Sequence, residues 1–121
     1  MKKKNALKIT VARGAGFCFG VKRAIDMAYR SAAEKNSRDV YSLRQIIHNP
    51  QEVKRLAEAG IRVVDAARDV KKNSRVIVSA HGVAPNEEKI LRGKAAEILD
   101  TTCPYVKKIH LIVSRLSAEG Y

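Results

Sequence analysis

Short runs of β-branched and aliphatic residues alternate with longer stretches of helical periodicity, and this alternation constrains the fold more than any other feature of the chain. The strand-like runs lie at residues 7–12, 39–43, 61–65, 75–80 and 96–100. In the longer stretches, apolar residues recur at the three- and four-residue spacing of a helix face. We therefore expect an α/β fold, a mostly parallel sheet flanked by helices.

Four helices are predicted from their boundary residues as well as from their periodicity. In the second one, Asn49 is a favourable N-cap, Pro50 takes the first helical position, and Gly60 ends the helix. The third and fourth also begin at a proline and close at a glycine. The predicted helices cover residues 19–34, 50–60, 85–93 and 104–120.

The length of 121 residues suits one domain with a single modest core. A hydrophobic content of 45% with 30% charged residues is typical of a folded globular segment. The chain has no apolar run of about 18 residues, and its Lys-rich start is not followed by a signal-peptide core. These features predict a cytoplasmic protein without a membrane span.

The charge of the chain is strongly positive, with 24 Lys and Arg against 12 Asp and Glu and a formal net charge of +12. Such a chain attracts phosphates, acidic proteins or anionic surfaces. Because the basic residues are spread along the sequence and aromatic residues are few, a nucleic-acid-binding module is only an alternative hypothesis. A non-catalytic remnant is a further alternative.

Four side chains suited to metal or phosphate chemistry follow predicted strands within a few positions: Cys18, His48, His81 and Cys103. Ligands of open α/β sheets bind beyond the carboxyl ends of the strands, so these side chains are expected to converge on one crevice. All but His81 also lie at or near a helix start, where free N–H groups favour anions and lower the pKa of thiols.

Each of these residues also has a plain structural interpretation. Cys18 lies between two phenylalanines and could equally be a small buried hydrophobe. The nearby Gly14, Gly16 and Gly20 favour the functional interpretation, because they allow close approach of something bulky. His48, next to Asn49, and His81 lie in turn-like contexts where functional and structural roles are about equally expected.

His110 is expected to be structural or to support the site, because it shares the predicted inner face of the last helix with Val106 and Val113. The glycines at 14–16 do not match a dinucleotide fingerprint, since no acidic residue follows a second strand as required. A structural zinc site normally gathers its ligands in close pairs, whereas an iron–sulfur site tolerates the wide separation of the two cysteines better.

Four motifs together carry a resemblance to a known family: "GFCFGVKRAI", "IIHNP", "SAHGV" and "DTTCPYVKKIH". In this order and spacing they resemble the 4-hydroxy-3-methylbut-2-enyl diphosphate reductases, whose members are more than twice as long. The resemblance implies the last step of the methylerythritol phosphate pathway, a reductive dehydroxylation that yields isopentenyl and dimethylallyl diphosphates. It also implies a [4Fe-4S] cluster, with Cys18 and Cys103 as two of three cysteine ligands, and His48 and His81 on the substrate diphosphate.

The same resemblance implies a fold of three α/β domains arranged as a trefoil. Residues 1–103 would form one domain, with the first strand belonging either to it or to a missing domain, and residues 104–121 would begin the second. The electron donor would be an acidic ferredoxin or flavodoxin.

The chain departs from the family pattern in ways that bear on activity. It has no third cysteine, and the family's proton-donating glutamate would lie beyond Tyr121, so the chain alone is expected to be inactive. A smaller departure is Leu43-Arg44, near which the family commonly has a glycine.

Overall fold

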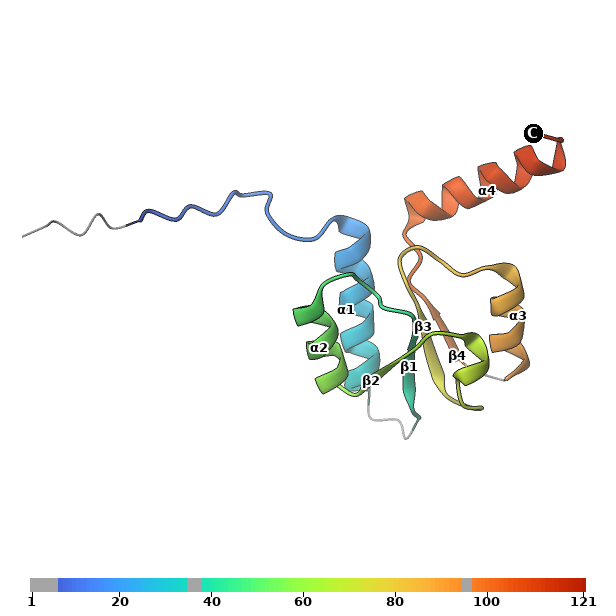
Figure 1. Cartoon of the computed structure of the whole chain (residues 1–121), viewed down its shortest axis with the longest axis horizontal. Helices are drawn as coiled ribbons and strands as arrows, with labels where there is room; N and C mark the ends of the chain where they lie inside the picture. Colours follow the sequence, from blue (N-terminus) through green and yellow to red (C-terminus); the bar gives the residue numbers. More distant parts are fainter. Residues whose placement is uncertain (1–6, 35–37, 95–96) are drawn as a thin grey trace, which may run out of the picture.

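The computed structural model describes residues 7–34, 38–94 and 97–121, and its centre is a parallel sheet of four strands (Figure 1). The strands are β1 (Val40–Leu43), β2 (Ile61–Val64), β3 (Arg75–Val78) and β4 (Glu97–Asp100). Their order is β2-β1-β3-β4, and every neighbouring pair is parallel. The predicted α/β fold is confirmed; Ala96, the first residue of the last predicted strand, lies outside the described residues.

Within the described residues, four α-helices and one short 3₁₀ helix accompany the sheet. They are α1 (Phe19–Ala33), α2 (Pro50–Glu58), η1 (Ala67–Asp69), α3 (Pro85–Gly93) and α4 (Pro104–Ala118). The predicted cap of α2 is present, because the Asn49 side chain accepts a hydrogen bond of 3.0 Å from the backbone N–H of Glu52. None of the helices among the described residues has the length and apolar character needed to cross a membrane.

Two hydrophobic clusters form the core, one on each face of the sheet. Helices α1 and α2 cover one face, whereas η1 and α3 cover the other (Figure 1). Alternate residues of β3 serve the two faces, since Ile77 packs with α1 while Val76 and Val78 pack with Leu91 of α3. The two central strands, β1 and β3, are buried along their whole length, as expected for strands covered on both faces.

The chain leaves the two central strands in opposite directions. From β1 it passes through α2 to β2 on one side, and from β3 it passes through α3 to β4 on the other. The order of the strands therefore reverses between β1 and β3. Beyond the carboxyl ends of these strands lies the crevice in which α/β sheets of this kind bind ligands.

The predicted strand at residues 7–12 is wrong for the described chain. These residues have no regular secondary structure, and Leu7, Ile9 and Val11 are 92%, 87% and 77% exposed. In Figure 1 they extend away from the sheet. Apolar side chains of the strand type form a strand only when a neighbour completes the hydrogen-bond ladder, and within the described residues no such neighbour is present.

The predicted inner face of the last helix is not buried in the described chain. Helix α4 projects away from the sheet (Figure 1), and it has no buried residue. His110 and Val113 are exposed, and Val106 is half-buried. The periodicity correctly predicts a helix with an apolar face, but it does not say which part of a molecule covers that face.

Candidate functional site

The four predicted ligand residues all lie toward the carboxyl edge of the sheet. His48 follows β1, His81 follows β3, and Cys103 follows β4 as the N-cap residue of α4. Cys18 is the N-cap residue of α1. Parallel strands bring their carboxyl ends to one edge, so the shared position follows from the topology.

His48 and His81 lie beside each other. Their ring centroids are 6.3 Å apart with planes inclined at 36°, and both side chains are exposed. They come from the loops after β1 and β3, on either side of the point where the strand order reverses. At this separation both imidazoles can donate hydrogen bonds to one anion of phosphate size between them.

Cys103 is held close to the first turn of α1. A Cβ atom placed on Gly20 would lie 2.7 Å from the Cys103 Sγ and 2.9 Å from its Cβ, so only glycine fits there. The backbone N–H of Cys103 donates to the carbonyl of Ala80 over 3.0 Å, which ties it to the loop after β3. Because Cys18 caps the same helix two residues before Gly20, both thiols belong to the start of α1.

The three glycines singled out in the sequence differ in what surrounds them. Gly20 meets Cys103, as described above, whereas a Cβ on Gly14 or Gly16 would meet nothing within 4 Å. Gly16 nevertheless has a φ of +138°, a backbone conformation that favours glycine. A ligand-approach role for Gly14 and Gly16 remains a prediction.

Gly82 is a site residue that the sequence reasoning missed. Its φ is +85°, and a Cβ at this position would lie 2.8 Å from Cε1 of His110 and 3.4 Å from Cγ2 of Thr102. The imidazole of His110 thus contacts the loop that carries His81, although α4 is otherwise exposed. The signal was present in "SAHGV", where a glycine directly follows the histidine in a turn.

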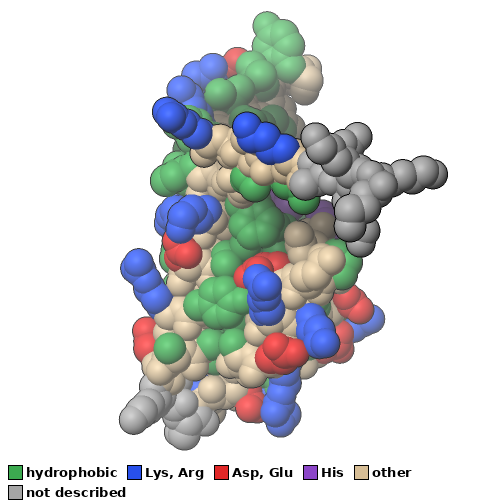
Figure 2. Space-filling model, turned by 90° about the vertical axis from the view of Figure 1, so that its left-hand side faces the viewer, with side chains coloured by type: hydrophobic (Ala, Val, Ile, Leu, Met, Phe, Trp, Pro, Cys, Tyr) green, Lys and Arg blue, Asp and Glu red, His purple; other side chains and the backbone are tan. Residues whose placement is uncertain are grey.

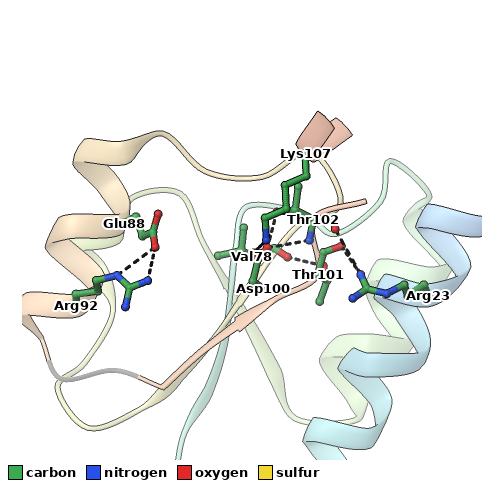
Figure 3. Close-up of polar contacts among 8 residues, drawn as sticks. All are labelled: Arg23, Val78, Glu88, Arg92, Asp100, Thr101, Thr102 and Lys107. Carbon is green, nitrogen blue, oxygen red and sulfur yellow. Dashed lines mark hydrogen bonds and ion pairs between the residues drawn. The ribbon is translucent and has the colours of Figure 1, made fainter. Parts of the chain in front are cut away.

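A carboxylate network fixes the segment before Cys103 (Figure 3). Oδ1 of Asp100 accepts hydrogen bonds from the backbone N–H of Thr102, at 2.9 Å, and from its hydroxyl, while Oδ2 accepts from Lys107 Nζ at 2.6 Å. The Thr101 hydroxyl donates to the carbonyl of Val78. The sequence patterns did not predict a role for these residues. The signal is the aspartate at the end of a strand, because an Asp side chain often accepts a hydrogen bond from the backbone N–H two residues later.

The network sets the acidity of Asp100. Burial raises the pKa of Asp100, but the hydrogen bonds from Lys107 and Thr102 outweigh it and lower the pKa from 3.8 to about 2. At a pH above the ordinary pKa of 3.8, the ionised Asp100 carboxylate therefore stabilises the fold. This contribution is lost as the pH falls from about 4 through about 2.

We expect an NMR titration of the Asp100 carboxyl carbon to show a midpoint near pH 2. Lys107→Met is expected to raise that midpoint, because it removes the cation bound to Oδ2. Lys108→Met is the matched control, since it removes the neighbouring exposed cation and is expected to leave the midpoint in place. A wild-type midpoint near 3.8 would contradict the network.

Two clefts lie between α4 and the body of the domain. One, of about 590 Å³, is lined among others by Asp100, Lys107 and His110. The other, of about 480 Å³, includes His81, His110 and Arg44. Arg44 pairs with Glu87 of α3 and has a φ of +61°, in the left-handed region that favours glycine. This geometry explains physically why a glycine would suit the Leu43-Arg44 position.

The donor set of the described residues is incomplete for a metal. Within residues 7–34, 38–94 and 97–121, no three His, Cys, Asp or Glu side chains come together as a metal site. Cys18 is exposed and Cys103 is partly exposed, and both are free thiols. Thiolates are the ligands that iron–sulfur clusters require, so these two residues fit part of a cluster's ligand set, and further ligands would have to come from elsewhere.

Comparison with known proteins agrees with these motifs. A family model described as LytB protein matches residues 9–121. A curated relative from Aquifex aeolicus, named 4-hydroxy-3-methylbut-2-enyl diphosphate reductase, is 46% identical over 93% of this chain and 38% of its own length. A relative of the same name from Clostridioides difficile is 43% identical over 95% of this chain and 41% of its own length.

Solved structures match the fold as well. The structure of an (E)-4-hydroxy-3-methyl-but-2-enyl diphosphate reductase superposes with a TM-score of 0.77 and 45% identity, covering 93% of this chain and 40% of that one. A reductase structure from Plasmodium falciparum gives a TM-score of 0.82 at 32% identity, covering 90% of this chain and 34% of the other. The chain thus spans about two fifths of the length of the curated relatives described above. The four motifs, the fold and these matches show that the chain belongs to the LytB family, that of the 4-hydroxy-3-methylbut-2-enyl diphosphate reductases, and corresponds to an N-terminal part of its longer members.

Proposed function

We propose that this chain is one domain of an enzyme that reductively removes the hydroxyl group of 4-hydroxy-3-methylbut-2-enyl diphosphate. The products are isopentenyl and dimethylallyl diphosphates. The observation that carries the proposal is the placement of two thiols and two imidazoles, within the family's motifs, toward one edge of the sheet. The domain supplies part of an active site, and the remaining residues come from the rest of the enzyme.

Cys18 and Cys103 are proposed to hold two irons of a [4Fe-4S] cluster. When bound, such a cluster would pass on, one at a time, the two electrons that the dehydroxylation takes from the external electron donor. The contribution of this chain is to present two thiolates at the start of α1, where the free N–H groups of a helix N-terminus favour negative charge. A third cysteine would come from outside this sequence, which has only two.

His48 and His81 are proposed to hold the substrate diphosphate by donating hydrogen bonds to its oxygens. Helix α2 begins two residues after His48 and adds the partial positive charge of its N-terminus. The net charge of +12 further favours an anionic substrate. The diphosphate is thereby fixed at one place, which lets its distant hydroxyl be oriented toward the thiols.

Residues 1–103 are proposed to form one domain and residues 104–121 to begin the next. The exposed apolar side chains of α4 fit this division, and those before α1 fit a first segment that packs with a missing domain. They include Leu7, Ile9 and Val11 before α1, and Tyr105, Ile109, Leu111, Ile112 and Val113 on α4. Apolar surface of this extent in a native protein is normally covered by another part of the molecule.

An acidic ferredoxin or flavodoxin is the proposed electron donor, because the chain is strongly basic. The basic charge alone would also fit nucleic acid. On the face seen in Figure 2, however, Lys and Arg side chains are interspersed with Asp and Glu. A nucleic-acid groove needs a continuous basic surface, and this face does not present one.

The test joins residues 1–121 to the downstream part of the Aquifex aeolicus relative and reconstitutes the chimera anaerobically with iron and sulfide. We expect cluster absorbance and reductase activity in the chimera, and neither in the 121-residue chain alone. The intact relative, treated in parallel, is the control. If the relative is active but the chimera binds no iron and has no activity, the proposed function is wrong.

A further inference from the structure

Arg23 links helix α1 to the loop that carries Cys103. Its Nη1 lies 3.4 Å from the carbonyl oxygen of Thr101 and 3.4 Å from that of Thr102, the two residues directly before the cysteine (Figure 3). The side chain is half-buried and emerges from the second turn of α1. One guanidinium therefore contacts two successive peptide groups.

The other hydrogen bonds of this loop lead elsewhere. Thr101 donates its backbone N–H to Val78 over 3.2 Å, and Cys103 donates to Ala80, so β3 and the loop after it hold these two residues. Asp100 holds Thr102 from within the same segment. Among the hydrogen bonds of the described residues, only those of Arg23 join the loop to α1.

Thr101 and Thr102 are buried, so their carbonyl groups have little access to water as an alternative partner. The two N–H bonds of Nη1 can each point to one of these carbonyls, which favours the present orientation of both peptide planes. The direction of the next Cα–Cβ bond, that of Cys103, is favoured with them. Gly20 leaves the space into which the thiol then points.

We propose that Arg23 is a positioning residue, which sets the place of the Cys103 thiol relative to Cys18. This role of Arg23 rests on the proposed function, in which Cys18 and Cys103 bind the same cluster. Among the described residues, the guanidinium makes no hydrogen bond to either thiol. It acts through the peptide groups of Thr101 and Thr102.

The test measures the rate at which iodoacetamide alkylates each cysteine of the reduced chain, resolved by mass spectrometry of the two peptides. Arg23→Met keeps the aliphatic part of the side chain and removes the donors. We expect this variant to raise the alkylation rate of Cys103 about fivefold over the wild type, because the loss of one ordinary hydrogen bond corresponds to about that factor. The alkylation rate of Cys18 is expected to stay within about twofold of the wild-type rate. Arg23→Lys keeps a cation but lacks the planar guanidinium, so it is expected to restore the difference only in part.

Lys22→Ala is the matched control, because Lys22 is the adjacent cation on α1 and pairs with Asp26 at 2.9 Å, away from the loop. Its two alkylation rates are expected to equal those of the wild type. If Arg23→Met changes neither rate, raises both equally, or loses helical circular dichroism, Arg23 serves at most the stability of α1 and the positioning role is wrong. This readout needs no cluster, so it is independent of whether the chimera binds iron.

Discussion

Gly20→Ala is expected to destabilise the chain by about 2 kcal/mol, even though alanine is the better helix former. The added methyl group would lie 2.7 Å from Sγ and 2.9 Å from Cβ of Cys103, well inside van der Waals contact. The cysteine cannot easily retreat, because its backbone N–H is bonded to Ala80 and the two preceding carbonyls are bonded to Arg23. Urea unfolding followed by circular dichroism measures the free energy of unfolding.

Gly93→Ala is the matched control for this experiment, since Gly93 is also helical but a Cβ there would meet nothing within 4 Å. It is expected to be neutral or to stabilise the chain by up to about 1 kcal/mol. A second cycle with Cys103→Gly tests the cause, because removing the cysteine side chain should recover most of the loss in the double variant. If Gly20→Ala had the same effect in the wild type and in the Cys103→Gly variant, the destabilisation would not come from a clash between residue 20 and the Cys103 side chain.

The helices and central strands could be predicted because their signals are local. Asn49 and Pro50 fix the start of α2 through a cap that involves residues no more than three positions apart. The short β-branched and aliphatic runs of β1 and β3 predict strands, and the structure shows that both are buried along their whole length. Residues 7–12 have the same composition but no ladder partner among the described residues, so composition alone could not decide their structure.

For the site, the sequence predicts which residues lie at the same edge of the sheet, but not the contacts between them. Parallel topology brings His48 and His81 to one edge of the sheet, and their 6.3 Å separation follows that expectation. Arg23 was not singled out, because its partners lie 78 and 79 residues away and a surface arginine on a helix is unremarkable in sequence. The contact between His110 and Gly82 likewise depends on how α4 leaves the sheet, which the sequence does not specify.

Replacing His48 or His81 by alanine in the chimera is expected to weaken the binding of the allylic diphosphate about thirtyfold, the loss typical of a hydrogen bond to a charged group. Iron content is expected to stay at the level of the unsubstituted chimera, because in this proposal the imidazoles hold phosphate oxygens rather than iron. The two histidines lie side by side, so the double variant should lose less than the product of the single losses. Calorimetric titration with the substrate and an iron assay on the same samples give both values.

Lys72→Ala is the matched control, because Lys72 is exposed and precedes β3, at the end of the sheet opposite to the histidines. Removing this cation lowers the net charge without touching the crevice, so affinity should change by less than about twofold. A loss like that of the histidine variants would mean that overall charge, not the imidazole pair, attracts the diphosphate. If the histidine variants lost iron together with affinity, His48 and His81 would instead be metal ligands, because substitution of a residue that binds only phosphate leaves the iron content unchanged.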